Sequence, residues 1–198
     1  MRTNSPEQGY IHNLDRDKGE RVVGQGFEAE KMVQAMFQKN FPNMEVRYST
    51  DKEDSGFKGQ GVGSKMVDVV VSEKTERGTI PSMALQVTTN ADKFAIEKKI
   101  KEMKDMPFVR LEEMSGDDVS VPRVLIFLEA GQVKRASESE EQELTRSLSL
   151  KILEDTLKSL QFDLTQTKFP KQRDHVQKLI QRMDETKKSL QSNEKAGQ

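Results

Sequence analysis

The spacing of apolar residues predicts a chain that begins with a helix and continues through short strands. Residues 22–40 carry apolar side chains at helical intervals, and Pro42 ends this segment because proline cannot continue a helix. The next apolar runs are rich in β-branched residues, which is typical of strands. They predict strands over residues 44–50, 66–72 and 83–89, with the last two buried on both faces and a turn region between them.

A second helix and a fourth strand are predicted next. Asn90 or Asp92 is expected to cap a helix that runs to about Met106, and residues 124–130 form the most apolar strand. Short connections make the first three strands an antiparallel meander, and the intervening helix places the fourth strand parallel to the third. The expected fold is therefore an α/β domain with a mixed sheet.

The last third of the chain has a helical pattern. Pro170 separates two apolar stripes, and the second of them predicts a helix over residues 176–190. The first stripe has the alternating intervals of three and four residues that are typical of a coiled coil, through Leu150, Leu153, Leu157, Leu160 and Leu164. This helical pair could pack on its own sheet, or it could join two copies of the chain.

These patterns divide the chain into four parts. Residues 1–18 are polar and aperiodic, and we expect a flexible arm there. Residues 19–136 form the α/β core, and residues 137–190 form a C-terminal helical extension. Residues 191–198 are expected to be a frayed tail.

Composition excludes several classes of function. The 198 residues include no cysteine and only two histidines, which are far apart in the sequence, so thiolate zinc sites, cysteine nucleophiles and histidine-rich metal sites are excluded. The net charge of -1 means that any nucleic-acid binding must come from a local patch. No run approaches the ~18 apolar residues of a membrane span, and we expect a cytoplasmic protein.

Three polar residues stand where apolar ones are expected. Asp68 interrupts the strand MVDVVVS, Gln86 interrupts the strand MALQVTT, and Glu30 borders the apolar stripe of the first helix. A carboxylate inside a strand is costly unless it has a partner or a cation. Oxygen ligands without histidine or cysteine suit Mg²⁺ or Mn²⁺, whereas hydrogen bonds to strand ends or a lysine partner would explain Asp68 without a metal.

The order of these features resembles the restriction-endonuclease-like, or PD-(D/E)XK, nuclease superfamily. A helix with a glutamate, a strand, a strand with an aspartate, a strand with the motif [E/Q]-x-K, a helix and a strand follow each other over about residues 22–130. The resemblance implies an αβββαβ core and metal-dependent phosphodiester hydrolysis. It also implies that Asp68 is the central metal ligand, that Gln86 takes the acid position, and that Glu30 supports the site.

The sequence departs from the family pattern at the motif lysine. Thr88 stands where the resemblance expects this lysine, which would help to ready the attacking water and stabilise charge near the phosphate. Lys93, at the start of the next helix, is the expected replacement, and Lys65 is a weaker one. Lys58 and Lys65, in the glycine-rich loop of residues 51–65, are expected to contact phosphates.

Three functions follow from these observations. The leading expectation is a Mg²⁺- or Mn²⁺-dependent nuclease that acts on nucleic acid, with Glu30, Asp68, Gln86 and Lys93 as its catalytic set. The alternative is a catalytically inactive nuclease-like fold that serves as a nucleic-acid- or protein-binding or assembly module. A third option is a structural protein whose helical pair recruits a partner. A homodimer through the C-terminal helices is a further expectation.

Overall fold

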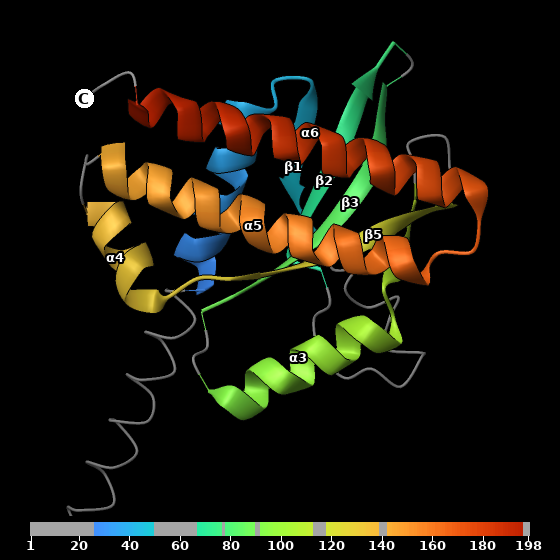
Figure 1. Ribbon diagram of the computed structural model, residues 1–198. Helices are drawn as coiled ribbons and strands as arrows, with labels where there is room; N and C mark the ends of the chain where they lie inside the picture. The colour runs from blue at the N-terminus through green and yellow to red at the C-terminus, as the bar shows by residue number, and fades with distance from the viewer. Residues whose placement is uncertain are drawn as a thin grey trace, which may run out of the picture.

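The computed structural model describes residues 26–49, 67–76, 78–89, 92–112, 118–138 and 142–195. Its centre is one five-stranded mixed sheet with the strand order β1-β2-β3-β5-β4 (Figure 1). β1, β2 and β3 are antiparallel neighbours, whereas β3 and β5 are parallel, as the sequence predicts. The strands are β1 (Met44–Tyr48), β2 (Val69–Thr75), β3 (Gly78–Thr88), β4 (Phe108–Glu112) and β5 (Asp118–Phe127).

Five helices accompany this sheet within the described residues. The helix of residues 26–40 and the long helices α5 and α6 share the larger hydrophobic cluster with one face of the sheet. Figure 1 shows α3 apart from α5 and α6, beyond the sheet. In the part of the chain that the structure describes, no helix is long and apolar enough to cross a membrane. The labelled helices are α3 (Lys93–Asp105), α4 (Ala130–Glu138), α5 (Gln142–Gln166) and α6 (Pro170–Lys195).

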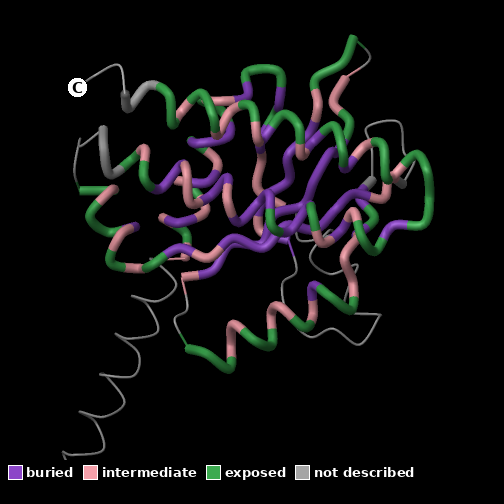
Figure 2. Tube along the Cα trace, in the orientation of Figure 1, coloured by how far each residue is buried: buried purple, intermediate pink, exposed green. Residues whose placement is uncertain are grey.

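Burial is concentrated at the centre of the sheet. Figure 2 shows a continuous buried path along the central strands, whereas α3 is mostly exposed. Residues 81–88 of β3 are all buried, which agrees with the predicted strand buried on both faces. Met103 is the one residue of α3 that is buried. Asp92 caps this helix as predicted, because its side chain accepts a hydrogen bond from the backbone N–H of Phe94.

The predicted turn region between the second and third strands is wrong. β2 continues to Thr75 and β3 begins at Gly78, so most of this region is a β-hairpin. Gly78 has a φ of 122°, a conformation that glycine adopts without steric cost and that allows a tight turn. The polar residues of this hairpin lie where it projects into solvent, which is why the segment lacks the apolar signal of a strand.

The β4–β5 hairpin was also missed. β4 is absent from the sequence prediction, and β5 begins at Asp118 rather than at residue 124. β4 pairs only with β5 and has five residues, so its alternation of buried Val109, exposed Arg110 and buried Leu111 is too short to stand out in the sequence. Pro122 and Arg123 interrupt the apolar run of β5, so the sequence pattern indicates a strand only after them. Helix α4, which begins directly after the last strand, was not predicted either.

The helices α5 and α6 form an antiparallel pair that belongs to the core of the sheet. Leu153, Leu157 and Leu160 are buried in the same cluster as Val176 and Leu179 of α6. The side chain of Arg146, near the start of α5, donates a hydrogen bond to the backbone carbonyl of Leu190, near the end of α6. The central leucines of the seam therefore pack on their own chain.

Helix α5 also closes an open edge of the sheet. β4 pairs with β5 only as far as Pro122, so the following residues of β5 have no strand on that side. Ser159 of α5 accepts a hydrogen bond from the backbone N–H of Leu125 (3.1 Å), and Asp155 accepts one from that of Phe127 (3.0 Å). Four residues of helix and two residues of strand both advance by about 6 Å, so successive turns of α5 meet alternate residues of β5.

We expect the substitution Ser159→Ala to destabilise the protein by about 1–3 kcal/mol, because it leaves the buried N–H of Leu125 without its acceptor. Urea unfolding followed by circular dichroism measures the change. Ser147→Ala removes an exposed hydroxyl from the same helix and is the matched control. Equal midpoints for the two variants would contradict the role of α5 at this edge.

Candidate functional site

Asp68 lies at the junction that precedes β2 rather than deep inside a strand, which corrects the sequence prediction. It is half-buried, and its backbone N–H donates to the carbonyl of Leu85 on β3 (2.9 Å). Its carboxylate Oδ2 accepts a hydrogen bond from the backbone N–H of Val87 (2.7 Å). The side chain thus continues the β2–β3 ladder beyond the start of β2. This contact satisfies part of the carboxylate and holds it beside Gln86.

Gln86 is buried and faces a cation that the sequence analysis did not consider. Its Oε1 accepts a hydrogen bond from Nη2 of Arg123 on β5 at 2.5 Å. Arg123 is fully buried, and its Nη1 donates to the backbone carbonyl of Glu102 on α3 (3.3 Å). Burial lowers the pKa of Arg123, whereas the neighbouring carboxylates of Glu102, Asp68 and Asp163 raise it. A buried guanidinium is therefore the central charge of this site.

The other predicted residues lie around this centre. Thr88 is buried at the end of β3, two residues beyond Gln86. Lys93 is exposed at the first turn of α3, where its Nζ is 3.9 Å from a carboxylate oxygen of Glu97. Glu30 is half-buried on the helix of residues 26–40 and contributes to the raised pKa of Tyr48, after the larger effect of burial. Lys58 and Lys65 lie outside the described residues.

The structure places the carboxylate of Asp68 against the backbone of Val87, the residue that follows Gln86, and the groups around them match a divalent cation poorly. The carboxylate of Asp68 already accepts a hydrogen bond from the backbone of Val87 on β3. The amide oxygen of Gln86 already accepts a hydrogen bond from Arg123. A divalent cation there would lie close to the guanidinium and would be repelled. Among the described residues, no three histidine, cysteine, aspartate or glutamate side chains form a group that could hold a metal ion.

A second buried ionisable group, Asp163, lies on α5, one turn beyond Ser159. Asp163 is fully buried, and within the described part of the chain neither of its carboxylate oxygens has a hydrogen-bond partner. Burial raises the pKa of Asp163 to about 8, and the positive charge of Arg123 opposes this shift. Asp155, Ser159 and Asp163 thus follow each other at intervals of four residues along the edge of β5. Burial therefore favours the protonated, neutral form of this carboxyl group.

The sequence contained signals for both missed residues. Arg123 is the one charged residue among residues 119–128, a segment of otherwise apolar and small residues, so its position between strand residues signalled burial. Asp155, Ser159 and Asp163 form a polar stripe at helical spacing beside the leucine seam. Polar residues next to an apolar seam more often face solvent, and only the open edge of β5 explains their burial.

An apolar pocket is present elsewhere, between the helix of residues 26–40, α4 and α5. Its lining includes the side chains of Met32, Met36, Leu148 and Ile152, and Lys39 is its one charged residue. Asp68, Gln86 and Arg123 are not among its lining residues. The pocket therefore offers apolar surface rather than acid–base groups.

Comparisons with known proteins do not assign this chain to a family. No protein-family model, no curated protein and no solved structure matches it. The functional interpretation therefore depends on the geometry of the site.

We expect Asp163→Asn to stabilise the protein at pH 8 and above, with little effect near pH 4. Below pH 4 the carboxyl group is protonated in both the folded and unfolded states. Between about pH 4 and 8 the unfolded chain releases this proton while the folded protein retains it, so the stability of the unmodified protein falls as pH rises. The asparagine variant avoids this loss, which is on the order of a few kcal/mol.

Urea unfolding at pH 4, 6 and 8 measures this difference. Asp155→Asn is the control, because the carboxylate of Asp155 accepts hydrogen bonds from Lys151 and from the backbone of Phe127. This control is expected to lose stability. If Asp163→Asn were equally destabilising at every pH, Asp163 would instead be an ionised partner of Arg123.

Proposed function

We propose that this chain is a nuclease-like fold that has lost the metal-dependent step and serves as a nucleic-acid-binding module. The observation that carries the proposal is the hydrogen bond between Arg123 Nη2 and Gln86 Oε1. In the related fold that the sequence resembles, a metal ion would balance the carboxylates of this site. Here an internal guanidinium supplies the positive charge, and a neutral amide replaces one of the acids.

Two further features support the loss of catalysis. Thr88 has a hydroxyl group where the resemblance expects a lysine ammonium, so it supplies no positive charge to a scissile phosphate. Lys93 carries such a charge but is 85% exposed and lies near Glu97. A guanidinium that is fully buried has no open position for a phosphate either.

The binding part of the proposal depends on α3. This helix contains five lysines and three acidic residues, so its net charge is +2 although the whole chain has a net charge of -1. Its backbone contacts Arg123 through Glu102, so it covers the side of the sheet that carries Gln86. A local positive surface on one helix favours a polyanion such as nucleic acid.

Metal-dependent phosphodiester hydrolysis, with Mg²⁺ or Mn²⁺, is the second candidate function. One observation supports it: the Asp68 carboxylate accepts a hydrogen bond from the backbone of Val87, directly after Gln86, so two of the residues in the expected set lie on adjacent strands. We retain a cytoplasmic location in both candidates. A homodimer through the C-terminal helices would have to use α5 and α6 residues outside the core, because Leu153, Leu157 and Leu160 pack internally.

We expect the unmodified protein to bind neither Mg²⁺ nor Mn²⁺ in isothermal titration calorimetry, and to cleave neither single-stranded, duplex nor branched nucleic acid. The physical reason is the repulsion between a divalent cation and the buried guanidinium. The double variant Arg123→Met/Gln86→Glu removes this cation and adds a carboxylate beside Asp68. It is expected to gain Mn²⁺ binding, whereas Arg123→Met alone keeps the neutral amide and should gain less.

The cleavage assay on the unmodified protein separates the two candidates even if a variant fails to fold. Divalent-dependent cleavage that Asp68→Asn abolishes would overturn the loss of catalysis and establish the second candidate. A protein that neither cleaves nor binds any of these nucleic acids would overturn the binding module. Fluorescence anisotropy with labelled oligonucleotides measures the binding.

A further inference from the structure

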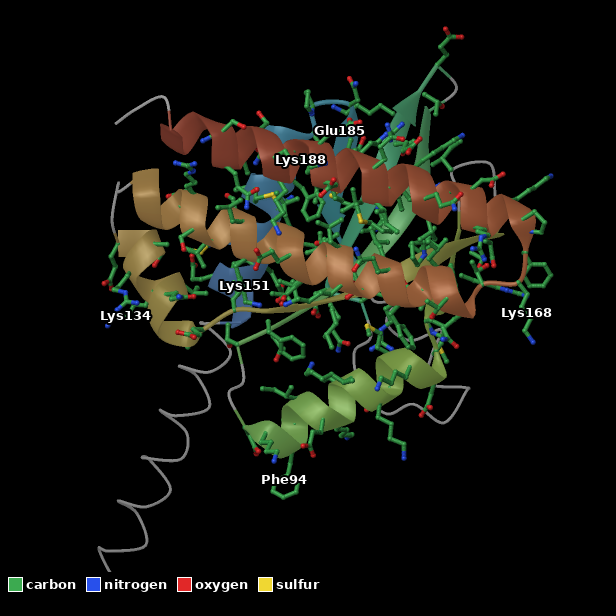
Figure 3. The ribbon with its side chains drawn as sticks, viewed as in Figure 1. Phe94, Lys134, Lys151, Lys168, Glu185 and Lys188 are labelled. Atoms are coloured by element: carbon green, nitrogen blue, oxygen red, sulfur yellow. The ribbon has the colours of Figure 1, made fainter. Side chains whose placement is uncertain are left out.

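The outer face of α3 combines an exposed aromatic ring with lysines. Phe94 is 80% exposed, more than any other aromatic side chain in the described part of the chain. Figure 3 shows its side chain pointing away from the sheet, at the first turn of α3. Burying such a ring against a ligand is favourable, and its position becomes informative where cationic side chains adjoin it.

Lysines continue this face along the helix. Lys98 and Lys101 follow Phe94 at intervals of four and seven residues, which places them on the same side at about 6 Å and about 10 Å along the axis. Both are exposed. Lys98 lies 3.8 Å from Glu102, whereas Lys101 forms no ion pair within the described residues. The face is therefore positively charged next to its aromatic end.

The attachment of α3 leaves this face accessible. Met103 is its one buried residue, and the helix is anchored through its last turns, where the Glu102 carbonyl accepts from Arg123. The first turn, with Phe94, extends away from this anchor (Figures 1 and 3). A flat ring and two cationic chains at one end of a helix provide a stacking surface and phosphate contacts together.

We propose that the outer face of α3 binds single-stranded nucleic acid, with one base stacked on Phe94 and the backbone phosphates on Lys98 and Lys101. This inference rests on the proposed function and names its substrate class. Single strands fit better than duplexes because a stacking ring needs a base whose face is free. An acidic polypeptide would use the lysines but would leave the Phe94 ring without a partner.

The test compares variants of full-length protein by fluorescence anisotropy with a labelled single-stranded oligonucleotide. Phe94→Ala is expected to weaken binding by about tenfold or more, since base–aromatic stacking contributes strongly to such sites. Lys98→Gln/Lys101→Gln is expected to reduce the slope of log K against log salt by about 1.4, because each phosphate contact contributes about 0.7 for single strands. Both substitutions affect exposed side chains, and circular dichroism verifies the fold.

Matched controls come from α6 and the turn before it. Phe169 is 68% exposed and lies outside α3, so Phe169→Ala tests whether any exposed ring serves equally well. Lys171→Gln/Lys178→Gln removes the same charge from exposed positions on α6. Neither control is expected to change the affinity more than twofold, an order-of-magnitude bound for a surface away from the contact.

Three results would overturn the inference. If the unmodified protein binds but the α3 variants match the controls, the α3 face is wrong and the proposed function stands. Equal affinity for a duplex of the same length, or for polyglutamate, would exclude stacking as the basis of recognition. Absence of any nucleic-acid binding by the unmodified protein would overturn the proposed function as well.

Discussion

The half-open edge of β5 is the constraint on which the arrangement of the C-terminal helices depends. β4 covers only the first part of this strand, and the N–H groups of buried Leu125 and half-buried Phe127 need acceptors. Ser159 and Asp155 supply them, so α5 is held at a defined height and rotation along the strand. That rotation turns its leucines into the core, where α6 packs on them. Polar side chains thus determine the position of an otherwise apolar seam.

The same edge brings two buried ionisable side chains near each other, Asp163 and Arg123. Asp163 continues the polar stripe of α5 by one turn and interacts electrostatically with Arg123. The guanidinium of Arg123 donates hydrogen bonds to Gln86 and to the backbone carbonyl of Glu102. Arg123 therefore connects α3, β3 and β5, and its positive charge lowers the pKa of Asp163 on α5, against the larger effect of burial. Removing one buried charge is usually destabilising, because each charged partner that remains loses the opposite charge that compensated it.

This connection links the fold to the proposed function. A site that depends on a metal needs an excess of carboxylate charge, whereas the pairing of Gln86 with Arg123 balances the site internally. Such a site stabilises the sheet without a bound cation. Positive charge is also found on the surface, where Lys98 and Lys101 of α3 share a helix face with the exposed ring of Phe94. Stability and binding would thus depend on separate parts of the molecule.

The sequence by itself determined the elements whose signals are local. Apolar periodicity and β-branched runs predicted the first helix, the central strands, their mixed order and the two C-terminal helices, and Asp92 was among the predicted caps. It also singled out Asp68 and Gln86, because polar residues are costly in apolar strands. Only the tertiary structure decided their partners: the guanidinium of Arg123 lies 37 residues from Gln86 in sequence. It likewise decided that β4 is a strand and that Asp163 is buried, because both depend on what lies across from them rather than on their own neighbours in the chain.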